Sequence, residues 1–222
     1  MRIWIIGFLA AGSASIAPFA KAQDAPAWSW SGSYLGIHAG MISGAVVALE
    51  DYRTPAVGPL VGAHIGRDWQ HGRLVFGMVA DLTASWADNR RQYDPVFKLP
   101  PVERHTQLGA SIALRGRIGA LIAERVLIYA TGGPVLALVK QYQAAMSFGT
   151  PAVWPTPSVS RALGHYGVTM GVGAELRVTT SLSIVSEYRH TWLNARAYSP
   201  MLSDLNTSFQ GHEGRIALNY RF

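Results

Sequence analysis

The chain of 222 residues contains no cysteine, and only 14% of its residues are charged. The absence of cysteine excludes disulfide frameworks, thiol catalysis and cysteine-ligated zinc sites. Long apolar runs are also lacking beyond the N-terminus, where a membrane-spanning helix would need about 20 residues. The longest run, Val126 to Val139, has 14 residues, is interrupted by two glycines and Pro134, and ends at Lys140. These absences argue against a disulfide scaffold and against a helical membrane domain.

The first 22 residues have the layout of a signal peptide. Arg2 precedes an apolar run from Ile3 to Ala11, and the motif Ala20-Lys21-Ala22 matches a cleavage site. A permanent membrane anchor is the alternative, but glycines and a proline interrupt the run, and no stop-transfer charges follow it. We therefore predict a cleaved signal peptide over residues 1–22, export from the cytoplasm, and a single domain over residues 23–222.

The charge balance is only mildly basic. Without Arg2 and Lys21, the chain keeps 17 basic and 13 acidic side chains, a formal net charge of +4. A nucleic-acid-binding surface would gather Lys and Arg on one patch, whereas here they are spread along the whole chain. Nucleic acid is therefore not an expected partner.

The C-terminal residues alternate between apolar and polar or small side chains. Ile216, Leu218, Tyr220 and Phe222 fall at every second position, with Arg215, Asn219 and Arg221 between them. Successive side chains of a strand point to opposite faces. This segment therefore predicts a strand with one apolar face and one polar face.

Eight segments of about ten residues follow similar patterns and are separated alternately by short and long connections. The predicted strands are Ser33 to Met41, Leu60 to Trp69, Leu74 to Trp86, Leu108 to Ala120, Val126 to Val139, Tyr166 to Arg177, Leu182 to Thr191 and Phe209 to Phe222. The predicted long connections are Ile42 to Pro59, Ala87 to Gln107, Lys140 to His165 and Trp192 to Ser208. This layout is typical of an all-β, eight-stranded antiparallel up-and-down transmembrane β-barrel with both termini in the periplasm.

Charged side chains avoid the apolar face of these segments. Arg67 shares the apolar face, next to Trp69 at a short connection, where a basic group can reach lipid headgroups. The charged side chains on the opposite face are Asp68, Asp81, Arg115, Arg117, Glu175, Arg177, Glu187, Arg189, Arg215 and Arg221. A soluble lipocalin-type barrel would have its apolar face inside, so this pattern favours a barrel with lipid outside.

Charges on the inner face need partners, because unpaired buried charges are very costly. We therefore expect an internal salt-bridge lattice, and an eight-stranded barrel is narrow enough for side chains to fill it. The candidate interior charges are Asp81, Arg115, Arg117, Glu175, Glu187, Arg189 and Arg215. A small-solute porin with a wetted path between these charges is the alternative.

Aromatic side chains are predicted to mark the membrane boundaries. Trp28, Trp30 and Trp69 gather near one end of the barrel, and Trp86 and Tyr166 near the other. The connection Lys140 to His165 adds Tyr142, Phe148, Trp154 and three prolines, which suggests contact with a partner; folding over the barrel mouth is an equal alternative.

Several blocks together resemble the outer membrane protein β-barrel family, the OmpA-like, porin-family surface antigens of Gram-negative bacteria. The blocks are Trp30 to Gly36, Gly66 to Gln70, Ala80 to Leu82, Leu114 to Gly119, Tyr129 to Gly133, Gly171 to Glu175, Glu187 to Arg189 and Asn219 to Phe222. The terminal Tyr220 and Phe222 are similar to the family's signal for the barrel-assembly machinery. Val79 and Val185 depart from the family, which often has an acid and a lysine at these inward positions.

The resemblance implies a structural or surface-interaction role in the outer membrane. The implied partners are membrane lipid and lipopolysaccharide, the barrel-assembly machinery, and a host or extracellular ligand at the loops. No enzyme activity, cofactor, catalytic site or metal site is predicted. His38 and His64 are interpreted as hydrogen-bonded interior residues in preference to metal ligands. A lipid-modifying enzyme using Ser186 and His190 is a weaker alternative, because no third orienting group is evident.

Overall fold

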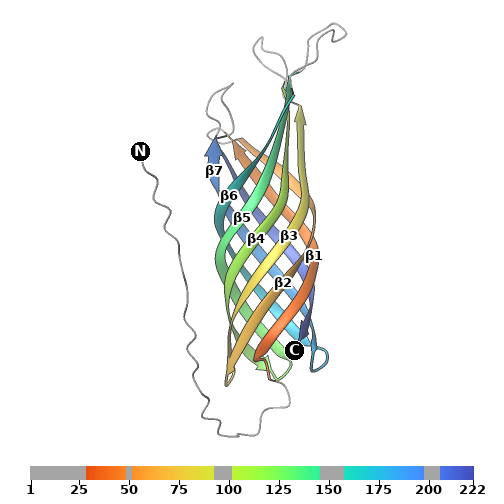
Figure 1. Cartoon of the computed structure of the whole chain (residues 1–222), viewed down its shortest axis with the longest axis vertical. Helices are drawn as coiled ribbons and strands as arrows, with labels where there is room; N and C mark the ends of the chain where they lie inside the picture. The colour runs from red at the N-terminus through yellow and green to blue at the C-terminus, as the bar shows by residue number, and fades with distance from the viewer. Residues whose placement is uncertain (1–28, 49–51, 93–101, 146–157, 198–205) are drawn as a thin grey trace, which may run out of the picture.

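The chain forms one closed barrel of eight antiparallel strands (Figure 1). The computed structural model describes residues 29–48, 52–92, 102–145, 158–197 and 206–222. Each strand pairs with the next along the chain, and β1 closes the barrel on β8. The strands are β1 (Gly32–Ala48), β2 (Tyr52–His71), β3 (Leu74–Gln92), β4 (Val102–Ala123), β5 (Val126–Ala145), β6 (Ser158–Arg177), β7 (Leu182–Ala197) and β8 (Asn206–Arg221). The predicted fold class is thus confirmed.

The strands run further than the sequence pattern predicts. The connection predicted over residues 42–59 is wrong over most of its length, because β1 extends to Ala48 and β2 begins at Tyr52. The other three predicted long connections are also too long, because the first and last residues of each belong to the flanking strands. Backbone ladder hydrogen bonds continue beyond the part of each strand in which apolar and polar residues alternate in the sequence, because backbone pairing does not depend on that alternation. Apolar alternation therefore marks the membrane band and underestimates the strand length.

Three short connections lie at the end of the barrel where the chain also ends (Figure 1). We call this the short-turn end, and the opposite end the long-connection end. Gly72 turns the chain between β2 and β3 with φ +61°, a left-handed conformation that glycine adopts without strain. Among the described residues there is no helix long and apolar enough to cross a membrane.

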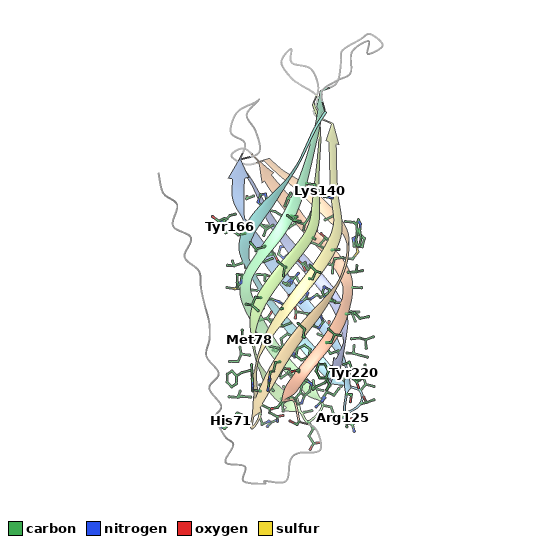
Figure 2. All side chains as sticks on the ribbon, in the orientation of Figure 1. His71, Met78, Arg125, Lys140, Tyr166 and Tyr220 are labelled. Carbon is green, nitrogen blue, oxygen red and sulfur yellow. The ribbon has the colours of Figure 1, made fainter. Side chains whose placement is uncertain are left out.

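The outer surface carries a continuous apolar band. Leu82, Leu114 and Val172 are each at least half exposed on different strands. Figure 2 shows Tyr220 beside the short-turn end and Tyr166 towards the opposite margin. Trp69 and Trp86 are also exposed on the wall, as predicted for the two aromatic margins. Exposed apolar surface of this extent is rare in soluble monomers. It is typical of the lipid-facing band of an outer-membrane barrel.

Glycines on the inner face make room for large side chains. A Cβ atom at Gly66 would lie 2.3 Å from the Tyr34 ring, and one at Gly173 would lie 2.5 Å from the Tyr129 ring. These two tyrosines are themselves buried. The inward glycines therefore allow aromatic side chains to fill a narrow barrel.

Candidate functional site

The barrel interior gathers charged side chains into two layers. The residues of the upper charge network, nearer the long-connection end, are Asp81, Arg115, Glu187, Arg189, Glu213 and Arg215. The residues of the lower charge network, nearer the short-turn end, are Asp68, Arg117, Glu175 and Arg221. All ten side chains are buried. Each network contains as many acids as arginines.

Asp81 is the centre of the upper charge network. Its Oδ2 atom accepts a hydrogen bond from Arg115 Nε at 2.9 Å, and its Oδ1 atom accepts one from Arg189 Nη1 at 3.0 Å. Arg215 Nη1 lies 3.7 Å from the same Oδ1 atom. One carboxylate on β3 thus forms ion pairs with three arginines, which belong to β4, β7 and β8.

Glu187 completes the layer from the opposite wall. Its Oε1 atom accepts hydrogen bonds from Arg115 at 2.7 Å and from Arg215 at 2.5 Å. Tyr129 donates its hydroxyl to Oε2 at 2.8 Å. The Tyr129 ring also lies 3.9 Å from the guanidinium carbon of Arg117, which belongs to the lower network. Tyr129 therefore links the two layers through a hydrogen bond and a cation–π contact.

Glu213 is a member of the upper network that the sequence interpretation did not single out. Its Oε2 atom accepts two hydrogen bonds from Arg189, at 2.9 and 2.5 Å. Its position, two residues before Arg215 on the same face of β8, is the signal that could have revealed it.

The lower charge network has two centres, Asp68 and Glu175. Arg221 donates to Asp68 at 2.8 Å, and Arg117 donates to Glu175 at 2.5 Å. Ser183 donates its hydroxyl to the other oxygen of Glu175 at 2.5 Å. Both carboxylates are fully buried. Such charges are stable only with this degree of pairing and hydrogen bonding.

A cavity of about 20 Å³ lies between the two networks. It has about the volume that one water molecule occupies. Val79 and Val185 both line it, and both are buried. Two apolar side chains thus occupy the inward positions at which the resembled family often has an acid and a lysine. Each arginine that lines the cavity already has an acidic partner.

The interior near the long-connection end contains a buried apolar cluster, beside buried polar side chains such as His165 and Ser85. Leu60, Val135 and Phe209 belong to a buried cluster contributed by β1 to β5, β7 and β8. This cluster lies between the upper charge network and the long-connection end. Its members are inward residues of the same strands, farther from the short turns than the charged residues are. A packed apolar layer excludes water and hydrated ions.

Trp30 fills the interior at the short-turn end. Its side chain is 0% exposed, its indole nitrogen donates to the Glu124 carbonyl at 3.1 Å, and Arg177 and Arg221 lie over its ring. The prediction that Trp30 belongs to the outer aromatic belt is therefore wrong. The residues just before β1 place the ring inside the barrel, in a buried cluster with Val75 and Leu127, instead of on its wall. Trp28 lies outside the described residues.

The interior histidines are hydrogen-bonded, as predicted. His38 and His64 approach each other at 3.3 Å between their Nδ1 atoms, and their Nε2 atoms contact Thr83 and Asn219. On the outer wall, Ser186 and His190 lie on one face of β7, four residues apart. An extended strand separates such residues by about 13 Å, too far for a hydrogen bond between a nucleophile and its base.

The apolar outer band and the charge-filled interior define a transmembrane β-barrel of the outer-membrane class. A model of the outer membrane protein beta-barrel domain matches residues 6–222, so the chain belongs to this family. The 31 kDa outer-membrane immunogenic protein of Brucella melitensis biotype 1 is 28% identical, over 93% of this chain and 88% of that protein. The 22 kDa outer membrane protein of Rhizobium leguminosarum bv. viciae is 27% identical, over 90% and 83%.

Among solved structures, the attachment invasion locus protein Ail of Yersinia pestis aligns with a TM-score of 0.41 and 15% identity. The alignment covers 86% of this chain and 99% of that one.

Proposed function

We propose that the protein is a closed outer-membrane barrel with a structural or surface-interaction role, and that it is neither a solute channel nor an enzyme. The observation that carries this proposal is the filled interior. Trp30, the lower charge network, the upper charge network and the apolar cluster follow one another along the barrel axis. A solute would have to displace each layer in turn.

The porin alternative would use Arg115, Arg117 and Arg189 to select solutes. Each of these arginines has at least one acidic partner within 3.0 Å. Buried pairs of this kind are costly to separate, because one charge is left without compensation. The pairing supports a structural role for these arginines.

The enzyme alternative needs a nucleophile with an adjacent base. His190 has His212 and Trp192 as its neighbours, and Ser186 is four positions away along β7. The Brucella relatives are named as immunogenic proteins of the outer membrane. We extend the outer-membrane location of these relatives, and no catalytic role, to the present chain.

The proposed partners follow from the outer surface. Membrane lipid and lipopolysaccharide would contact the apolar band and its aromatic margins. A host or extracellular ligand would bind the connections at the long-connection end, which fall largely outside the described residues. The predicted signal peptide, residues 1–22, also lies outside them, and its cleavage stays a prediction.

The barrel-assembly machinery is the proposed partner of the C-terminal aromatics. Phe222 is 72% exposed, and its ring lies 6.5 Å from that of Tyr220 on the outer wall. Deletion of Phe222 is expected to reduce the folded barrel in cells severalfold, while refolding in detergent stays nearly normal. Heat-dependent gel mobility of membrane fractions and of refolded protein measures both. Equal losses in cells and in detergent would contradict a role in recognition, and Tyr166→Phe, on the outer wall towards the opposite margin, is a control remote from the terminus.

Complementation of a deletion strain tests the proposed role. We would express the full chain or a variant with residues 146–157 replaced by a Gly-Ser linker, after showing that both fold. If the role is surface interaction, we expect the linker variant to restore detergent resistance of the envelope but to lose adhesion to host cells. If the role is purely structural, the full chain and the linker variant should both restore the envelope, and neither should change adhesion. Growth that depends on uptake of a small solute through the barrel would contradict both roles.

A further inference from the structure

A polar cluster interrupts the outer wall where β7 and β8 meet. His190 and His212 stand directly opposite each other in the ladder, with 3.0 Å between their Nδ1 atoms. The hydroxyl of Tyr188 contacts the same Nδ1 atom of His212. The Trp192 ring stands edge-on to His190, with 4.1 Å between ring centroids. Three electron-pair donors therefore converge on one point of the outer surface.

The cluster lies at the margin of the apolar band. On the short-turn side, the outward residues of the same two strands include Ile184, Ile216 and Leu218, with Ser186 and Gly214 between them and the cluster. On the other side, the next outward residues include Gln210 and Asn194, both exposed. Trp192 is one of the aromatic side chains at this margin. The three donors are thus within reach of water and of ions from outside the cell.

His212 Nδ1 faces both His190 Nδ1 and the Tyr188 hydroxyl. Without a metal ion these contacts are hydrogen bonds, because the hydroxyl donates and an imidazole nitrogen can accept. A metal ion that displaces the shared protons would use the same lone pairs. A metal ion accepts a lone pair from each donor at once. Bonds of about 2.0–2.1 Å at tetrahedral angles place two coordinating nitrogens about 3.3 Å apart, close to the separation of the two Nδ1 atoms.

Space for the remaining ligands is present beside the cluster. Gly214 stands opposite Tyr188 in the ladder, and a Cβ atom built on it would meet no atom within 4 Å. Water molecules can complete the coordination from the opposite side, where Gln210 and Asn194 are exposed.

The interior histidine pair does not offer the same site. His38 and His64 have both Nε2 atoms engaged and lie close to the arginines of the upper charge network, which repel a cation. Within the described part of the chain, no three His, Cys, Asp or Glu residues are grouped as a metal site. The outer cluster is distinguished by its third donor, a tyrosine, and by its exposure.

We propose that His190, His212 and Tyr188 form a surface site for one divalent transition-metal ion of the Zn²⁺ or Cu²⁺ type. The two imidazole Nδ1 atoms are the main ligands, the Tyr188 oxygen is the third, and water occupies the open positions. Imidazole nitrogen favours these metals over Ca²⁺ and Mg²⁺, which prefer oxygen ligands.

Metal titration of the refolded barrel, residues 23–222 in detergent, tests the site. Calorimetry with Zn²⁺ is expected to give one ion per barrel, and electron paramagnetic resonance with Cu²⁺ is expected to show two coordinating nitrogens. His190→Gln and His212→Gln should each weaken binding by about 100-fold, since loss of a ligand should cost at least as much as loss of an outer-shell partner. His71→Gln, which removes an exposed histidine at the short-turn end, is the matched control and should bind like the wild type.

Thermal unfolding gives an independent readout, because an ion that binds only the folded barrel raises its melting temperature. We expect Zn²⁺ to stabilise the wild type and His71→Gln, and not the double variant His190→Gln/His212→Gln. Heat-dependent gel mobility shows beforehand that each variant is folded. Binding to the double variant as tight as to the wild type, or binding lost equally in His71→Gln, would overturn the proposal.

Discussion

Asp81→Asn is expected to lower the free energy of unfolding by about 3–5 kcal/mol, because removing one partner of a buried ion pair leaves charge uncompensated. Asp81 contacts Arg115, Arg189 and Arg215, so the substitution leaves three arginines facing two acids. Urea unfolding of the refolded barrel, followed by tryptophan fluorescence, measures the change. The asparagine keeps the shape of the side chain, and the loss therefore reports on charge.

Two further variants separate charge balance from general damage. Arg67→Gln removes an exposed arginine on the outer wall and should change stability by less than about 0.5 kcal/mol. Arg215→Met in the Asp81→Asn background removes the surplus positive charge and should recover part of the loss. An Asp81→Asn barrel that unfolds at the same urea concentration as Arg67→Gln would show that the upper charge network does not stabilise the fold.

The substitution Leu114→Arg is also expected to lower the stability of the barrel strongly. Leu114 is half exposed near the middle of the apolar stretch of β4, between neighbours whose side chains point inward. An arginine on the lipid face near the bilayer midplane should cost about 2–4 kcal/mol. Equilibrium folding into phospholipid vesicles measures this cost.

Val178→Arg is the matched control for this substitution. Val178 is also exposed but lies in the short turn between β6 and β7, where the expected cost is only about 0–1 kcal/mol. If Leu114→Arg and Val178→Arg are equally stable in vesicles, the outer band does not face lipid.

The apolar alternation predicts which face of each strand meets lipid and which face lines the barrel interior. A charge on the lipid face costs about 2–4 kcal/mol near the bilayer midplane, so the register of Leu114 and Arg115 can be read from their chemistry alone. Eight such segments with alternately short and long connections also determine the barrel topology. Both features are local in sequence, and the structure agrees with them.

The pairing within the lumen cannot be read in the same way. Arg115 and Glu187 are 72 residues apart, and their contact depends on how the strands are staggered around the closed barrel. The sequence does not reveal the place of Trp30, because an aromatic residue just before a strand suits a lipid boundary as well as the interior at the end of a barrel. At the long-connection end the predicted strands are too short, because the apolar alternation stops there while the backbone ladder continues.

The closed lumen is the central claim, and single-channel conductance of the refolded residues 23–222 in a planar bilayer tests it most directly. Heat-dependent gel mobility must first show a folded barrel, and an open porin measured in the same bilayer shows that insertion can be detected. We predict a folded barrel without steady openings, because Trp30, two paired charge networks and an apolar cluster fill its axis. Steady, reproducible openings would contradict this account and would make Arg115, Arg117 and Arg189 the residues to test for ion selectivity.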